Sequence, residues 1–159
     1  MILMLRVDHR LLHGQIAYSW TNYLNANCIL IANDGIMKDE LKKTAIYMAK
    51  PPSTKLVMKD IENSIKAINS GVTNQYRLLI IVETVEDAYR LLEGCENIRK
   101  INLGNSKVKD GGKQLAKTFY VLPEEEKQLQ QMLGRGVEIF IQRVPEVKAI
   151  PYLKWERGE

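Results

Sequence analysis

The residues with the richest chemistry in this chain lie together near its N-terminus. The segment RVDHRLLHGQ, Arg6 to Gln15, holds both histidines of the chain, two arginines and an aspartate. If a helix begins at Gly14, its free backbone N–H groups and the positive end of its dipole face the preceding loop, which suits an anion. A neutral imidazole nitrogen can attack phosphorus and later release the phosphoryl group to another acceptor. The segment therefore predicts a phosphate site in which His13 carries a phosphoryl group.

The neighbours of the second histidine provide the groups that phosphoryl transfer requires. Transfer asks mainly for positioning and charge neutralisation, so the guanidinium groups of Arg10 and Arg6 are candidate phosphate ligands. Asp8 is expected to fix the imidazole tautomer or to orient Arg10. Gly14 lets a phosphate approach the backbone closely, and with Gln15 it forms the expected helix start. The segment thus contains an acceptor, a charge clamp and an orienting group.

The segment allows two other interpretations. A solvated ion-pair network explains the arginines and the aspartate equally well, with His13 capping or packing at a helix end. A zinc site is the second alternative, because His9 and His13 stand four residues apart, as in the HExxH motif. That motif needs a glutamate directly after the first histidine, and Arg10 stands there with a charge that repels a metal. We therefore expect neither a metal nor a cofactor.

Residues that follow two other apolar runs are further candidates for the same site. Thr84 follows the run from Leu78 to Val82, where its hydroxyl could bind phosphate or could equally cap the next helix. Lys107 lies in the loop from Gly104 to Gly112, where it could border the site or lie on a plain surface. This loop is not a Walker P-loop, because its Gly-Lys pair is followed by glutamine. No GxGxxG follows any expected strand, which disfavours a dinucleotide-binding enzyme.

The elements that must position these residues follow a regular order. Short β-rich runs alternate with stretches of helical period, which is typical of βαβ units. Expected strands cover residues 2–7, 28–32, 55–58, 77–82, 100–103, 118–121 and 137–141, and expected helices cover 14–24, 38–49, 60–69, 85–93 and 123–135. We expect one α/β domain over residues 1–159, with a mostly parallel sheet of about seven strands flanked by helices on both faces. The tail from 144 to 159 could form a short helix or an extended arm.

Composition limits the class of protein. The 159 residues are 45% hydrophobic and 26% charged, with a formal net charge of +4, as in an ordinary globular protein. The longest apolar runs fall far short of the roughly 20 residues of a membrane-spanning helix, and no signal peptide is visible, so we expect a cytoplasmic protein. Cys28 and Cys95 lie outside any CxxC motif, which predicts two buried free thiols.

The segment RVDHRLLHGQIAYSWTNYLNA resembles the IIB components of the mannose, fructose and sorbose family of the sugar phosphotransferase system (PTS). The hallmark of that family is an arginine, an acidic pair and then RLxHGQ. The segment DELKKTAIYMAKPPSTKL resembles its second helix and the turn into its third strand, and residues 101–145 resemble its C-terminal half. The similarity covers nearly the whole chain, and the family fold agrees with the sheet expected above.

The resemblance implies an enzyme that works as a phosphocarrier. The family histidine before GQ, here His13, takes a phosphoryl group from a phosphohistidine of the IIA partner and passes it to a sugar held by the membrane partners IIC and IID. Arg10 matches the family arginine that contacts the phosphate. The resemblance also implies a cytoplasmic chain that reaches the inner face of the cell membrane through its partner subunits. It implies no nucleic-acid partner, and it leaves homo-oligomer formation open.

One residue departs from the family pattern. Relatives commonly have Asp-Asp before the arginine, whereas this chain has Asp8-His9. The change removes a negative charge and introduces a rival phosphoryl acceptor, although we expect His9 to lie in mid-loop and to point to solvent. A non-catalytic α/β module that binds an anion or a nucleic-acid phosphate through the same turn is the alternative function.

Overall fold

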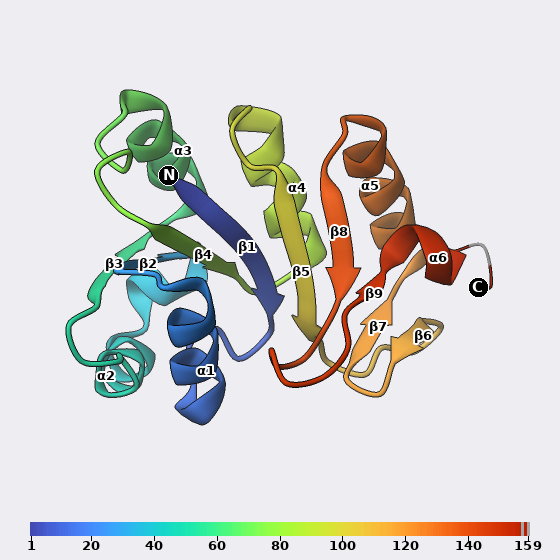
Figure 1. The fold of residues 1–159 in the computed structure, drawn as a ribbon, viewed down its shortest axis with the longest axis horizontal. Coiled ribbons are helices and arrows are strands. Elements are labelled where there is room, and N and C mark those ends of the chain that lie inside the picture. Colours follow the sequence, from blue (N-terminus) through green and yellow to red (C-terminus); the bar gives the residue numbers. More distant parts are fainter. Residues whose placement is uncertain (157, 159) are drawn as a thin grey trace.

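A seven-stranded sheet forms the centre of the computed structural model, which describes residues 1–156 and 158. The strand order is β3-β2-β4-β1-β5-β8-β9, and every neighbouring pair is parallel except β8 with β9. The strands are β1 (Ile2–Asp8), β2 (Cys28–Ala32), β3 (Lys55–Lys59), β4 (Leu78–Val82), β5 (Lys100–Asn105), β8 (Glu138–Ile141) and β9 (Ile150–Pro151). The expected α/β fold with a mostly parallel sheet is confirmed (Figure 1).

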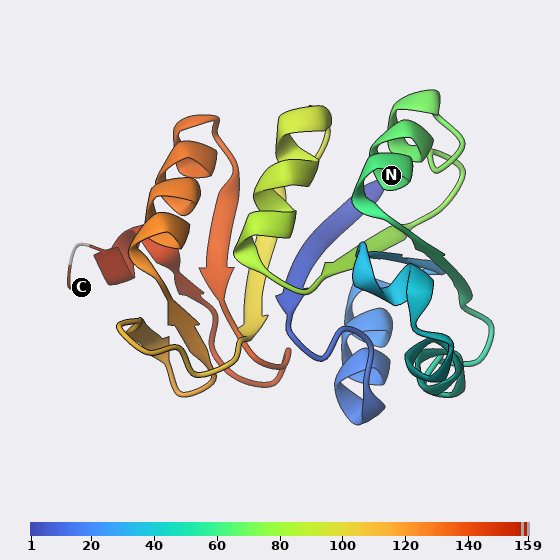
Figure 2. The same ribbon diagram turned by 180° about the vertical axis from the view of Figure 1, so that it is seen from behind.

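Helices cover both faces of this sheet. The helices α1 (Gly14–Leu24) and α2 (Glu40–Met48) pack on one face, and α3 (Ile61–Ser70), α4 (Val85–Gly94) and α5 (Pro123–Gly134) pack on the other (Figures 1 and 2). Two apolar clusters match these layers, one that includes Trp20 and Ile46 and one that includes Ile68, Leu91 and Leu129. Because strands are buried on both sides, β2 and β4 are apolar at every position.

The seventh strand of the sheet is not the one predicted. Residues 118–121 were expected to join the sheet, but β7 (Phe119–Val121) pairs antiparallel with β6 (Lys113–Ala116) in a separate hairpin. Residues 113–116 form a strand that is separated from β7 by two residues, so a short turn lets the two strands pair as a hairpin. Phe119 and Val121 are still buried, which explains the apolar pattern. The seventh place belongs to β9, in the tail whose structure the sequence left open.

Helix starts follow the cap signals of the sequence. The expected helix 38–49 is found as α2, which begins two residues later than expected. The chain first forms a 3-10 turn, η1 (Gly35–Lys38), and Asp39 then caps α2 by accepting a hydrogen bond from the Lys42 N–H at 3.0 Å. Thr84 caps α4 in the same way, with the Asp87 N–H donating to its Oγ1 at 3.1 Å. Cys28 and Cys95 are buried free thiols, as predicted.

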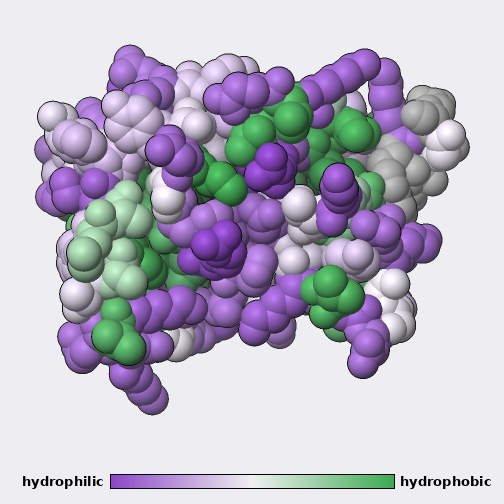
Figure 3. Space-filling view, turned by 90° about the horizontal axis from the view of Figure 1, so that it is seen from below, coloured by the Kyte–Doolittle hydropathy of each residue, from purple (hydrophilic) through white to green (hydrophobic). Residues whose placement is uncertain are grey.

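The carboxyl ends of β1, β4, β5 and β8 reach one edge of the sheet, at the bottom of Figure 1. Figure 3 looks onto this edge, and strongly hydrophilic side chains occupy its centre. Loops at the carboxyl ends of parallel strands are the usual place for a site in such a sheet. Among the described residues, no helix is long and apolar enough to cross a membrane.

The C-terminal tail, residues 144–159, contributes a buried side chain to the core as well as a strand to the sheet. After β9, the short helix α6 (Tyr152–Glu156) places Tyr152 in the cluster formed under α4 and α5, where it is 1% exposed. Leu153, the next residue, is 44% exposed. The tail therefore belongs to the folded domain.

We predict that Tyr152→Ala lowers the free energy of unfolding by about 3 kcal/mol, because it leaves a cavity in the core. Leu153→Ala is the matched control on the same helix and should cost less than about 1 kcal/mol. Urea denaturation followed by circular dichroism measures both values. Equal losses in the two variants would contradict the packing of the tail.

Candidate functional site

The loop after β1 brings the sequence-predicted residues together in a strained turn. β1 ends at Asp8, whose carbonyl oxygen accepts from the Leu11 N–H at 2.9 Å. Leu11 has a φ of 58° although it is not glycine, and its buried side chain holds it in the apolar cluster under α1. Gly14 has a φ of 42°, which favours glycine, so this residue is needed where the loop enters α1. Packing thus fixes a turn that would be unfavourable in isolation.

A buried carboxylate holds the ring of His13. The Nε2 atom of His13 lies 3.1 Å from Oδ2 of Asp8, and Asp8 is fully buried, whereas the His13 side chain is 15% exposed. The same carboxylate accepts from Nη2 of Arg6 at 2.9 Å, from Nδ2 of Asn105 at 3.1 Å and from the backbone N–H of Arg10 at 3.0 Å. Asp8 therefore lies in position to orient the imidazole, which is one of the two roles predicted for it.

The protonation state of Asp8 determines which ring nitrogen of His13 carries the proton in their contact. Burial alone would raise the pKa of Asp8, but the hydrogen bond from His13, the charge of Arg6 and the further donors outweigh it and lower the pKa to about 2. Asp8 is thus ionised and can only accept, so the proton in the contact belongs to Nε2 of His13. The other ring nitrogen, Nδ1, makes no hydrogen bond to any described residue. In the neutral ring, Nδ1 carries the lone pair.

Arg6 is a supporting residue, and its expected role as a phosphate ligand does not fit its position. Its guanidinium is 2% exposed and donates to Asn102 Oδ1 at 2.6 Å and to the Gln142 carbonyl oxygen at 3.3 Å, as well as to Asp8. The Cζ atom of Arg6 lies over the Trp20 ring, 5.5 Å from the ring centroid. Gly104 is required beside it, because a Cβ at this position would overlap the guanidinium. A phosphate in solvent cannot reach a group enclosed in this way.

The start of α1 offers free donors beside the ring. The first helical hydrogen bond runs from the Ala17 N–H to the His13 carbonyl oxygen at 3.2 Å, so the N–H groups of Gly14, Gln15 and Ile16 point out of the helix end. His13 is the N-cap residue, but its side chain makes no capping hydrogen bond, contrary to the alternative in which it merely caps the helix. Because the first turn holds no acidic residue, the helix dipole is left for a bound anion.

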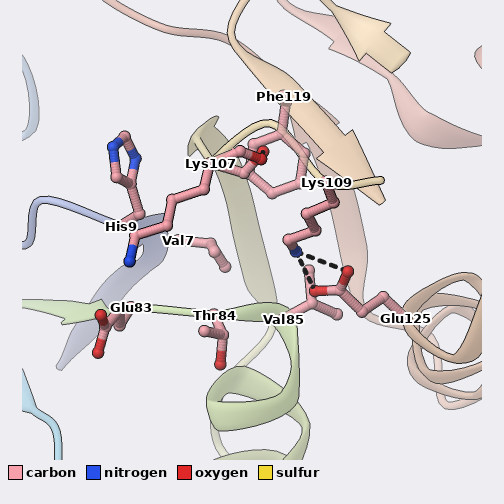
Figure 4. A pocket seen from close by; sticks show the side chains of 10 residues that line it. Val7, His9, Glu83, Thr84, Val85, Lys107, Lys109, Phe119 and Glu125 are labelled. Carbon is pink, nitrogen blue, oxygen red and sulfur yellow. Dashed lines mark hydrogen bonds and ion pairs between the residues drawn. The ribbon is translucent and has the colours of Figure 1, made fainter. Parts of the chain in front are cut away.

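Arg10 and His9 occupy different positions in the loop. The Arg10 side chain is exposed and forms no ion pair with any described residue. His9 does not point to solvent as expected, because it is half-buried and lines a small crevice between the ends of β1, β4 and β5 (Figure 4). Its Nδ1 is buried and has no hydrogen-bond partner among the described residues.

The crevice beside His9 contains Thr84 and Lys107 but not His13. Lys109 also lines it and is held by Glu125, with Nζ 2.6 and 2.7 Å from the two carboxylate oxygens (Figure 4). The Oγ1 of Thr84 is used as the cap of α4. The structure therefore brings His13, Asp8, Arg10, Gly14 and Gln15 together and places Thr84 in a neighbouring crevice.

Three supporting residues were missed by the sequence reasoning. Asn105 and Asn102 come from β5, and Gln142 follows β8; together they hold Asp8 and Arg6. These residues lie far from the first loop in the sequence, so no local motif indicates them. Asn105 alone could have been found, because it follows a predicted strand, and sites lie at the carboxyl ends of such strands.

The stability of the protein should fall in acid because of Asp8. A carboxyl whose pKa is about 2 when folded, against 3.8 ordinarily, contributes stability above pH 4 and loses it as the pH falls through 2. We expect roughly 2 kcal/mol at neutral pH from this group. Urea unfolding between pH 2 and 7 should show this decline in the original chain and a flatter profile in Asp8→Asn. Parallel profiles for the two proteins would refute it.

Comparisons with known proteins identify the family of this chain. Residues 2–155 match the family described as PTS system sorbose subfamily IIB component. The N-acetylgalactosamine-specific phosphotransferase enzyme IIB component 1 of Escherichia coli is 30% identical over 145 residues, which are 91% of each chain. A probable phosphotransferase enzyme IIB component of Streptococcus pyogenes serotype M6 is 37% identical over 105 residues, which are 66% of this chain and 64% of the relative.

The fold has been seen before in the same family. The IIB domain of the sorbose permease from Klebsiella pneumoniae superimposes with a TM-score of 0.92 at 23% identity, over 99% of this chain and 97% of that one. At this identity the likeness shows the fold alone. The family match and the relative that is 30% identical over 145 residues show similarity in the sequence as well. The chain therefore belongs to the sorbose subfamily of PTS IIB components.

Proposed function

We propose that this chain is the phosphocarrier of a sugar phosphotransferase system and that Nδ1 of His13 is its phosphoryl acceptor. The observation that carries the proposal is the contact between His13 Nε2 and the buried, ionised Asp8. This contact keeps the proton on Nε2 and leaves the lone pair on Nδ1, which makes Nδ1 the nucleophile. The same contact fixes the direction in which that lone pair points.

The reaction on this ring proceeds in two steps. In the first, Nδ1 attacks the phosphorus of a phosphohistidine on the IIA partner; the new P–N bond forms as the old one breaks, and the bonding pair returns to the donor imidazole. In the second, a sugar hydroxyl attacks the phosphorus, its proton passes to a base or water, and the electrons of the P–N bond return to Nδ1. The proton on Nε2 stays in its contact with Asp8 in both steps.

The surroundings of His13 suit a phosphoryl group that stays only briefly. The open N–H groups of Gly14, Gln15 and Ile16 supply partial positive charge and hydrogen-bond donors. The exposed guanidinium of Arg10 is the clamp on the phosphoryl oxygens, because it is unpaired and lies in the same loop. Thr84 is left outside this set, since its oxygen caps α4 and it lines the neighbouring crevice.

The partners follow from the family. PTS IIB components work with a IIA protein and with membrane subunits IIC and IID, and we propose these as donor and as holders of the sugar. The chain would then act at the inner face of the cell membrane through those subunits. A module that binds an anion without turnover is the alternative, and covalent phosphorylation separates the two.

We predict that His13→Ala takes no label from phosphoenolpyruvate in the presence of the upstream PTS donors, because it has lost the acceptor nitrogen. His9→Ala is the matched control and should be labelled like the original chain. The label should be labile in acid and stable in base, as a phosphoramidate is, and NMR of the labelled ring should show phosphorus on Nδ1. Label on His13→Ala would disprove the assignment, and an unlabelled original chain would favour the binding module.

We predict that Arg10→Ala slows phosphorylation of His13 by about 10- to 100-fold, because one charge-assisted contact to the phosphoryl group is lost. Arg99→Ala removes an exposed arginine beside a pocket at the far end of α4 and should leave the rate unchanged. Rapid-quench measurement of label incorporation gives both rates. The clamp role fails if both variants react alike.

A further inference from the structure

We propose that Arg143, on the loop after β8, is a second phosphate-binding arginine of the His13 site. The inference rests on the proposed function, since it assigns a ligand to the phosphoryl group carried by His13. Arg143 lies 130 residues from His13 in the sequence. The residue reaches the same edge of the sheet because β8 pairs in parallel with β5, which itself pairs in parallel with β1.

The backbone that carries Arg143 is held in place from several sides. Nε1 of Trp20 donates to the Arg143 carbonyl oxygen at 3.2 Å, which ties the loop to α1. The preceding residue, Gln142, donates its backbone N–H to the Leu103 carbonyl oxygen at 3.1 Å and its side-chain Nε2 to the Val147 carbonyl oxygen at 2.7 Å. A loop fixed in this way can hold a side chain in a defined position.

The residues that hold this loop are those that hold the site. Arg6 donates to the Gln142 carbonyl oxygen at 3.3 Å and to Asp8 at 2.9 Å, and Asp8 holds the ring of His13. Trp20, which binds the Arg143 carbonyl oxygen, also packs against the Arg6 guanidinium. One connected set of contacts therefore links Arg143 to the acceptor histidine.

The side chain of Arg143 is free to bind an anion. It is exposed, and within residues 1–156 and 158 its guanidinium forms no ion pair. It lies near enough to the Arg6 guanidinium to contribute to lowering the pKa of Arg6, although burial is the larger cause. The two guanidinium groups carry like charges that repel each other, and an anion bound between the loops relieves that repulsion.

The charge of the site fits its proposed cargo. Arg6, Arg10 and Arg143 carry three positive charges and Asp8 carries one negative charge, so these four side chains leave a net positive charge beside His13. A phosphoryl group is negatively charged at neutral pH and is attracted to this charge. With Arg6 fully engaged by its buried partners, Arg10 and Arg143 are the two arginines that can contact the phosphoryl oxygens directly.

The test uses phosphoramidate, a small donor that needs no protein docking. Arg143→Ala should be phosphorylated on His13 about tenfold more slowly than the original chain, because a charge-assisted contact is absent. Arg143→Lys should recover part of the rate, since an ammonium supplies the charge without the planar fork. Arg99→Ala is again the control. Because Trp20 binds the backbone of residue 143, the substitutions leave that tether in place.

Several outcomes would overturn the assignment. Equal rates for Arg143→Ala and the original chain with phosphoramidate would do so. A deficit seen only with the protein donor IIA would make Arg143 a docking contact and would equally refute phosphate binding. Failure of the proposed function looks different, because then His13→Ala is labelled or the original chain takes no label. If the original chain takes no label, phosphate binding is measured by titrating inorganic phosphate and following the NMR signals. An affinity for phosphate in Arg143→Ala equal to that of the original chain then rejects the assignment of Arg143.

Discussion

The ionised carboxylate of Asp8, buried beneath the loop after β1, is the interaction on which the site depends. A buried charge is costly unless partners satisfy it, and Asp8 receives donors from Arg6, Asn105, the Arg10 backbone and His13. Each donor comes from a different part of the site, so meeting the needs of one carboxylate also positions the others. The imidazole is one of these donors, which fixes both its tautomer and its direction.

The fold makes this interaction possible because the strained loop between β1 and α1 packs against the buried central sheet. Leu11 and Gly14 adopt positive φ values between the end of β1 and the start of α1, and the buried side chain of Leu11 holds the turn. β5 lies beside β1 and supplies Asn102 and Asn105, while Gly104 leaves the space that the Arg6 guanidinium fills. A rigid support of this kind keeps a catalytic ring within the small tolerance that group transfer demands.

The division of the positive charges follows from burial. Arg6 is enclosed and serves the carboxylate, whereas Arg10 and Arg143 remain exposed and unpaired among the described residues. Under the proposed function, the carrier must release its cargo as readily as it takes it, and exposed arginines with open helix N–H groups can bind phosphate without burying it. His9 lines the separate crevice with Thr84 and Lys107 and, among the described residues, forms no hydrogen bond with His13.

The sequence by itself determined the fold class, the helix from Gly14 to Leu24 and the cluster that contains His13, because periodicity, cap residues and a dense local motif depend on neighbours in the chain. The tertiary structure alone decided that Arg6 is a buried support, that β9 takes the place expected for residues 118–121, and that Asn102, Asn105 and Gln142 complete the site. The buried support arises from contacts between residues 96 to 136 positions apart, whose pairing is set by strand order and by the space left by Gly104. The place of β9 is set by its antiparallel pairing with β8. Local sequence patterns do not reveal contacts of this kind.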